Sequence, residues 1–192
     1  MRLQRWRHPG LALLAATLCA AAAVAARAQD EGRFEVRNAF VELVNGEWLL
    51  DVRLDLALAD AARQAFEEGV PLVLELEVEA SVERRFLPDA TVVSFKRQWQ
   101  LEFDAISERY VVTDVAESAR ETYAVEADAL AALARPPAIR VADQTVLPPG
   151  ARFGMRVRAQ VEIGELPAAI KLLLFWRSWS RETDWYAWSV RP

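Results

Sequence analysis

The sequence predicts a mainly β protein, an antiparallel β-sandwich with two short helices. Apolar and polar residues alternate over several long stretches, as expected for strands with one buried and one solvated face. This alternation is typical of antiparallel sheets, whereas the buried strands of parallel sheets are apolar throughout. Two stretches with helical spacing interrupt the strands, and the first lies between two long strands. An α+β fold with a parallel βαβ crossover is therefore the alternative.

The first two expected strands form a hairpin. Asn45-Gly46 joins alternating stretches at 34–40 and 48–56, and it is a favoured sequence for a two-residue type I′ turn. In the first strand, the period of two places four residues on one face: Phe34, Val36, Asn38 and Phe40.

A helix and two long strands are expected next. Apolar residues recur at helical spacing from Leu58 to Phe66, and Gly69 followed by Pro71 ends this helix. On the second of the two strands, Arg97 is an exception, a charged residue on the apolar side. The strands are expected at 72–82 and 95–103, with a turn at 86–89 between them.

The C-terminal half contains shorter elements and one long strand. A helix is expected at 126–134, because acidic residues occupy its first turn and Arg135-Pro136-Pro137 stands at its end. The long strand at 153–163 alternates cleanly between apolar and polar residues. Shorter strands are expected at 110–113, 139–141, 170–175 and 186–190. No linker divides residues 29–192, which are predicted to form a single β-rich domain.

The N-terminus has the pattern of a cleaved signal peptide. Basic residues precede an apolar run at 11–26, which is shorter than the roughly 20 residues of a membrane-spanning helix. Ala26-Arg27-Ala28 then supplies the small residues that signal peptidase requires. We expect residues 1–28 to be removed and the remainder to be periplasmic and not membrane-spanning. An uncleaved signal anchor is the alternative.

The mass of the exported protein tests this expectation. Intact mass spectrometry of a periplasmic extract should find a chain that starts at Gln29, because cleavage follows Ala28. Recovery of the chain from the membrane fraction with residues 1–28 still attached would contradict cleavage.

Composition excludes several classes of site. The chain has 192 residues, and all 28 acidic residues but only 19 of the 23 basic ones follow residue 28, which gives a net charge of −9 there. His8 and Cys19 are the only histidine and cysteine, and both precede residue 29. Without them, a Ser–His–Asp triad, a cysteine nucleophile, a disulfide and an imidazole or thiolate metal site are excluded. The acidic charge also disfavours nucleic acid as a partner.

The sequence therefore predicts no catalytic residue, no metal ligand and no cofactor. One acidic row, formed by Glu75, Glu77 and Glu79 on one strand face, has the oxygen ligands that Ca²⁺ accepts but lacks a loop that would converge them. We expect the row to be a solvated face that pairs with Lys96 or with Arg156 and Arg158. A pair of carboxylates in one cleft, as in a hydrolase, is not readable from sequence and stays a third possibility.

An aromatic segment near the C-terminus is the strongest signal of binding. Tryptophan and arginine are enriched at binding hot spots, and planar aromatic rings also stack on sugars and cations. The alternative is that these rings line the core, as expected for Tyr186, Trp188 and Val190, which share one strand face. The candidate binding residues are Trp176, Arg177, Trp179, Arg181 and Trp185.

Several features together resemble a known family. They are the helix that ends at Gly69-Val70-Pro71-Leu72, Arg84-Arg85 after a glutamate-rich strand, Leu166-Pro167 after an arginine-bearing strand, and the tryptophan-rich end. This pattern resembles a proteobacterial family described as a domain of unknown function, number 4390. The resemblance implies an envelope protein that is often encoded beside a membrane sensor kinase, and it implies no activity or cofactor.

The expected function is that of a non-enzymatic interaction module in the periplasm. Its expected partner is an envelope protein, and the resemblance points to a sensor kinase. The alternative is a small-ligand or glycan binder that uses the C-terminal aromatic cluster as its platform.

Overall fold

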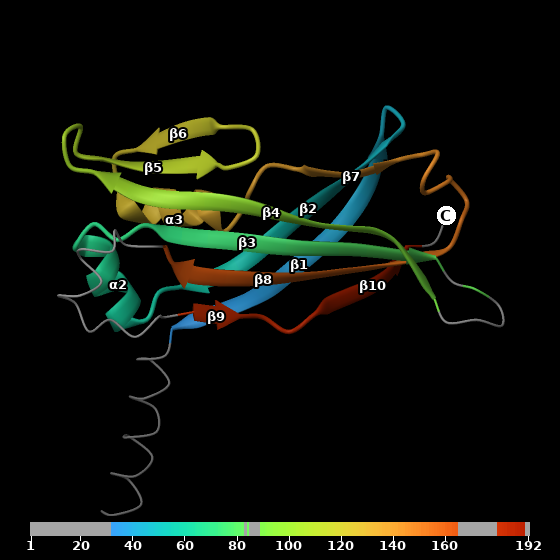
Figure 1. Cartoon of the computed structure of the whole chain (residues 1–192), viewed down its shortest axis with the longest axis horizontal. Coiled ribbons are helices and arrows are strands. Elements are labelled where there is room, and N and C mark those ends of the chain that lie inside the picture. The colour runs from blue at the N-terminus through green and yellow to red at the C-terminus, as the bar shows by residue number, and fades with distance from the viewer. Residues whose placement is uncertain (1–31, 83, 85–88, 165–179, 191–192) are drawn as a thin grey trace, which may run out of the picture.

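The computed structural model describes residues 32–82, 84, 89–164 and 180–190 (Figure 1). Three predicted segments lie outside these residues: the leader at 1–28, the turn at 86–89 apart from Asp89, and the strand at 170–175. The described elements are β1 (Arg33–Val44), β2 (Glu47–Ala57), α2 (Asp60–Glu67), β3 (Leu72–Val82), β4 (Ala90–Asp104), β5 (Arg109–Asp114), β6 (Ala119–Tyr123), α3 (Glu126–Leu133), β7 (Ile139–Asp143), β8 (Phe153–Ile163), β9 (Ser180–Glu182) and β10 (Tyr186–Val190).

The strands form two antiparallel sheets. The small sheet has the order β1-β2-β7, and the large one β10-β8-β3-β4-β5-β6, with β9 paired to β8. The predicted mainly β fold is confirmed. The helix α2 connects β2 in the small sheet to β3 in the large sheet, so these strands are not neighbours. The parallel βαβ crossover that was the alternative therefore does not form.

The β1–β2 hairpin confirms the turn but corrects one face. Asn45 and Gly46 have φ angles of 51° and 85°, the left-handed backbone that a type I′ turn requires at both positions. In β1, however, the register shifts between Val36 and Asn38. This bulge inserts an extra residue, which moves the following side chains to the other face. Consequently Ala39 is buried, whereas Phe40, predicted inward, is 36% exposed.

The helix α2 covers one end of the sandwich. Its predicted apolar stripe is buried, with Leu58, Ala62 and Phe66 each at most 6% exposed. Gly69 follows with a φ of 88°, a backbone conformation that ends a helix and that glycine adopts without steric penalty. The helix prediction is thus confirmed in both its buried face and its end.

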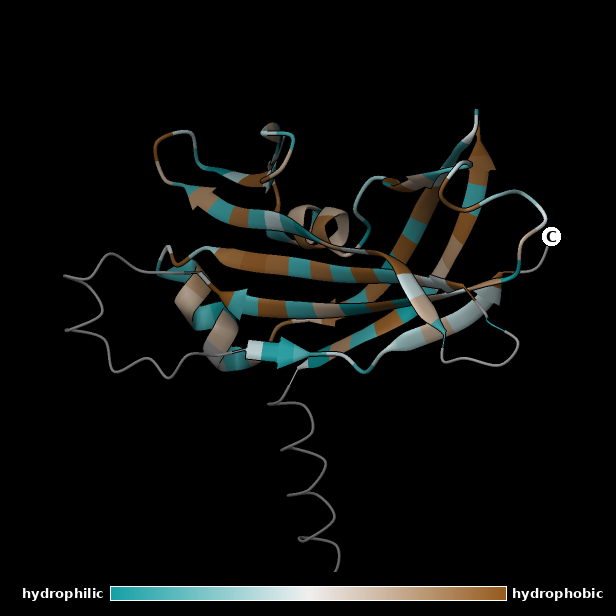
Figure 2. Cartoon of the chain, turned by 45° about the vertical axis from the view of Figure 1, so that its right-hand side comes forward, coloured by the Kyte–Doolittle hydropathy of each residue, from teal (hydrophilic) through white to brown (hydrophobic). Residues whose placement is uncertain are grey.

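The core lies between the two sheets. Figure 1 shows β1 and β2 running obliquely behind β3 and β8, and Figure 2 shows bands of hydrophobic and hydrophilic residues alternating along the long strands. Trp48 of the small sheet meets Phe153 of the large sheet edge to face, with ring centroids 5.1 Å apart. Side chains of both sheets form one buried cluster, which includes Leu50 and Val52 of β2, Leu74 and Leu76 of β3, and Val157 and Val161 of β8.

The helix α3 extends the layer of the small sheet. It contacts β4, β5 and β6, and it buries Ala129 and Leu133. This confirms the predicted helix, and β5, β7, β8 and β10 confirm the strands predicted around it. β6 and β9 are short and polar, and they were not predicted from the sequence. No helix among the described residues is long and apolar enough to cross a membrane.

Candidate functional site

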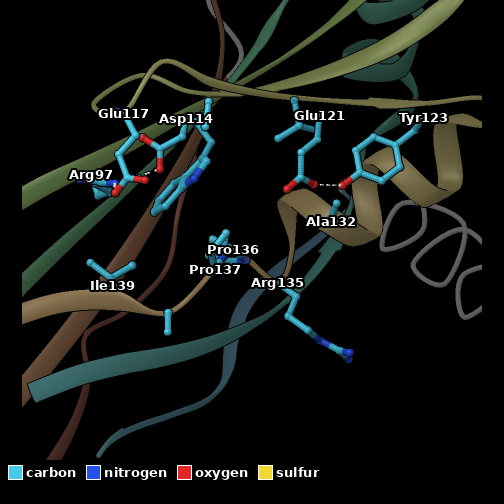
Figure 3. A pocket seen from close by; sticks show the side chains of 14 residues that line it. Arg97, Asp114, Glu117, Glu121, Tyr123, Ala132, Arg135, Pro136, Pro137 and Ile139 are labelled. Atoms are coloured by element: carbon cyan, nitrogen blue, oxygen red, sulfur yellow. Dashed lines mark hydrogen bonds and ion pairs between the residues drawn. The ribbon is translucent and has the colours of Figure 1, made fainter. Parts of the chain in front are cut away.

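A cavity of about 250 Å³ lies between the β4–β5–β6 part of the large sheet and the connection from α3 to β7. Its apolar lining includes Trp99 and Val112 from the sheet and Pro136 and Ile139 from the connection. Figure 3 shows charged side chains on two sides of the space above the prolines. The cavity thus combines an apolar wall with a polar rim, as ligand sites commonly do.

Arg97 is the central cation of this rim. It occupies the inward face of β4 opposite Leu76, where an apolar side chain is otherwise expected. Its Nη2 donates to Asp114 Oδ2 at 3.0 Å and also pairs with Glu117. Partial burial opposes the charged form, but the hydrogen bonds that Arg97 donates to Glu117 and Asp114 outweigh it and raise the pKa of Arg97 above its usual value.

The turn after β5 holds the two acids in place. Asp114 Oδ1 accepts hydrogen bonds from the backbone N–H groups of Ala116 and Glu117, at 2.9 and 3.1 Å. Such side-chain bonds to the following backbone stabilise turns. The same carboxylate therefore shapes the turn with one oxygen and binds Arg97 with the other.

Glu121 and Tyr123 line the opposite side of the cavity (Figure 3). They are two residues apart on β6 and share a face, and the Tyr123 hydroxyl donates to Glu121 Oε2 at 2.5 Å. Partial burial and the neighbouring carboxylate raise the pKa of Tyr123 to about 12. The phenol therefore remains a neutral donor to Glu121 at neutral pH.

Two buried N–H donors at the cavity have no hydrogen-bond partner within the described part of the chain. They are Trp99 Nε1 and Arg97 Nε. By contrast, the indole of Trp48 donates to the Leu147 carbonyl at 2.7 Å. Buried donors in folded proteins nearly always have an acceptor, and each one left without it costs about 1–3 kcal/mol.

A family model described as a domain of unknown function, DUF4390, matches residues 31–189. The chain belongs to the DUF4390 family. The family resemblance inferred from the sequence is therefore confirmed. No curated protein and no solved structure matches this DUF4390 chain.

The two predicted binding residues of this DUF4390 domain that the structure describes, Arg181 and Trp185, do not line the cavity. Trp176, Arg177 and Trp179 lie outside the described residues, and Arg181 lies on β9 opposite Val161. Trp185 packs against Arg156 and Arg158 on the outer face of the large sheet, whereas the cavity is on the inner face. As predicted, Tyr186, Trp188 and Val190 pack against the core instead.

Two guanidinium groups lie over the ring of Trp185. The Cζ atoms of Arg156 and Arg158 lie 4.4 and 4.8 Å from its ring centroid, within the range of cation–π attraction. Trp185 also lines a second hollow, of about 390 Å³, together with Glu182 and Asp184. The arginines compete for the ring surface that a sugar would need, so the cavity under β6 is the better candidate site.

The acidic row on the outer face is paired as predicted. Glu75 pairs with Lys96 at 2.6 Å, Glu77 with Arg158 at 2.7 Å, and Glu79 with Arg156 at 2.5 Å. Among the described residues, no group of three or more Asp, Glu, His or Cys side chains is arranged to hold a metal ion. The row therefore has the geometry of a cross-strand ion-pair ladder.

This ladder predicts how stability responds to acid. Partial burial disfavours the charged form of Glu75, but hydrogen bonds from Lys96 and Gln98 outweigh it and lower the pKa of Glu75 below 4.5. An acid with a lowered pKa in the folded state stabilises above its unfolded pKa, and this stability disappears as pH falls through the folded value.

The free energy of unfolding of the wild type should therefore fall as the pH is lowered from about 5 to about 3. In Glu75→Gln this fall should be smaller, by at most about 1 kcal/mol because the pair is partly exposed. Urea unfolding at a series of pH values measures this slope. Glu67→Gln, on the exposed side of α2, is the control. Equal acid slopes for wild type and Glu75→Gln would contradict the assignment.

Proposed function

We propose that this DUF4390 domain is a non-enzymatic interaction module of the cell envelope, and that it binds an extended segment of a partner along β6. One observation carries the proposal. β6 is the last strand of the large sheet, it is mostly exposed, and its alternate side chains Ala119, Glu121 and Tyr123 line the cavity.

An edge strand beside a cavity is the arrangement used in strand addition. The main chain of an added strand bonds to the exposed edge, and its alternate side chains enter pockets that select the sequence. β6 also carries Arg120 and Glu121, and charged residues on an edge strand discourage unselective pairing with other chains. The edge of β6 is thus suited to pairing with a specific partner sequence.

The state of the carboxylates supports binding over hydrolysis. Asp114 and Glu117 both bind Arg97, and Glu121 accepts a hydrogen bond from Tyr123. Paired acids in a glycosidase instead need separate environments, one that favours the protonated acid and one that favours the carboxylate. Here two of the acids share one cation, and the third is bound to a neutral phenol.

The proposed localisation is the periplasm, because residues 1–28 have the pattern of a cleaved signal peptide. The partner is then an envelope protein, and the family resemblance directs attention to a membrane sensor kinase. Its periplasmic segment, presented as an extended strand, is the expected binding element.

Site-specific crosslinking in intact cells tests this function. A photo-crosslinking amino acid at Thr122, exposed on β6, should yield one defined envelope adduct identified by mass spectrometry. The control position is Thr91, which is exposed at the other end of the large sheet on β4. Adducts that are absent from Thr122, or that are the same from both positions, would contradict a binding face at β6.

A further inference from the structure

We infer that the cavity under β6 selects a basic side chain, lysine or arginine, from the segment that binds along this strand. Glu121 is its counter-ion, and the apolar wall of the cavity holds its aliphatic stem. This inference rests on the proposed function and names the chemistry of the partner segment.

The charge of the rim favours a cation. Three carboxylates line the cavity, those of Asp114, Glu117 and Glu121, and Arg97 pairs with the first two. Within the described residues, Glu121 has a hydrogen bond from Tyr123 but no ion pair. Figure 3 shows the side chain of Arg135 extending away from Glu121. A cation that enters the cavity can therefore pair with Glu121, which has no basic partner among the described residues.

The shape of the cavity suits a long side chain with a charged end. Its volume of about 250 Å³ is several times the roughly 30 Å³ that one water occupies in the liquid. Trp99, Val112 and Pro136 offer apolar surface to an aliphatic stem, while Glu121 stands on the exposed strand at the rim. Lysine and arginine bury their stems along apolar surface in this way and keep the charge at a polar end.

Trp99 reports on the inside of the cavity. Its side chain lines the cavity and is only 3% exposed, and its Nε1 has no acceptor in the described part of the chain. A side chain that enters the cavity is therefore expected to change the environment of this indole.

An acidic segment is disfavoured at the same place. Its carboxylate would approach Glu121, which has no ion pair among the described residues, and like charges placed close together across an interface oppose binding. The net charge of the whole chain, −5, also attracts basic segments at long range.

Peptide titration followed by NMR tests the inference. The purified ¹⁵N-labelled protein is titrated with acetyl-Thr-Val-Lys-Val-Thr-amide and with two analogues that carry norleucine or glutamate in place of lysine. The readout is the indole N–H signal of Trp99, assigned with a Trp99→Phe variant. The lysine peptide should shift this signal saturably. The norleucine peptide should bind about fivefold more weakly, which is the upper end of the range for one partly exposed ion pair. The glutamate peptide should cause no shift.

Two variants separate the charge from the fold. Glu121→Gln should weaken the lysine peptide by about fivefold and leave the norleucine peptide unchanged. Glu102→Gln, on the other face of the same sheet, should change neither. Melting curves confirm that both variants fold.

Equal binding of the lysine and norleucine peptides, tighter binding of the glutamate peptide, or no saturable shift with any peptide would overturn the inference. If Thr122 captures an envelope partner but lysine is not preferred, the interaction module stands and the cationic pocket fails. If the lysine peptide binds but no adduct forms in cells, the pocket stands and the proposed function fails.

Discussion

Replacing Phe66 with alanine should lower the free energy of unfolding by roughly 3–5 kcal/mol, the usual range for truncating a buried aromatic ring. Phe66 is 1% exposed in the last turn of α2, and its ring centroid lies 5.9 Å from that of Tyr110 on β5. The alanine variant loses this burial and leaves a cavity between the helix and the large sheet. Urea unfolding at unchanged m-value measures the difference.

The control is on the same helix. Gln64 is exposed, and its side chain donates to the neighbouring Glu68 of the same helix end, so Gln64→Ala should change stability by no more than about 0.5 kcal/mol. If Phe66→Ala costs less than about 1 kcal/mol, α2 is peripheral and the sandwich does not depend on it.

Arg97→Met should destabilise the protein by about 3 kcal/mol, because it leaves a partly buried carboxylate without its cation. The Asp114 side chain is 11% exposed, and its Oδ2 receives the bond from Arg97. Glu117, at 67% exposure, remains solvated and adds little. Chemical unfolding of the variant at neutral pH gives this value.

A double variant shows whether the loss comes from the charge. In Arg97→Met/Asp114→Asn both charges are removed, so most of the lost stability should return, since apolar or neutral replacements of a buried pair are often tolerated. Arg120→Met removes an exposed partner of Glu102 and should cost about 1 kcal/mol or less. If Arg97→Met costs no more than Arg120→Met, Arg97 does not hold the cavity rim together.

Local patterns predicted most of the fold. Alternation identified β3 and β8, whose inward residues are buried except for the last one of each strand, Val82 and Ile163, which are partly buried. The hairpin turn was predictable because Asn45-Gly46 allows a left-handed backbone that few other pairs adopt. The inward position of the partly buried Trp188 and the outward position of Trp185 followed from the same period of two.

Other features had only a weak local signal. The bulge in β1 has no marker in the sequence, and it turned Phe40 outward. β6 is exposed and polar, and it is a strand because β5 supplies its hydrogen-bond partners. Arg97 was the one visible sign of the site, a charge on an apolar face, although its partners were not predictable.

The sequence by itself determined the mainly β class, the positions of the long strands and α2, and the absence of histidine and cysteine after residue 28. Periodicity and backbone preference act over a few neighbouring residues, so they are readable one segment at a time. The cavity was decided only by the tertiary structure. It joins Arg97 on β4, Glu121 on β6 and Pro136 after α3, which meet because the second layer packs α3 beneath the end of the large sheet. Contacts between distant segments depend on how the layers pack, and no local pattern records that packing.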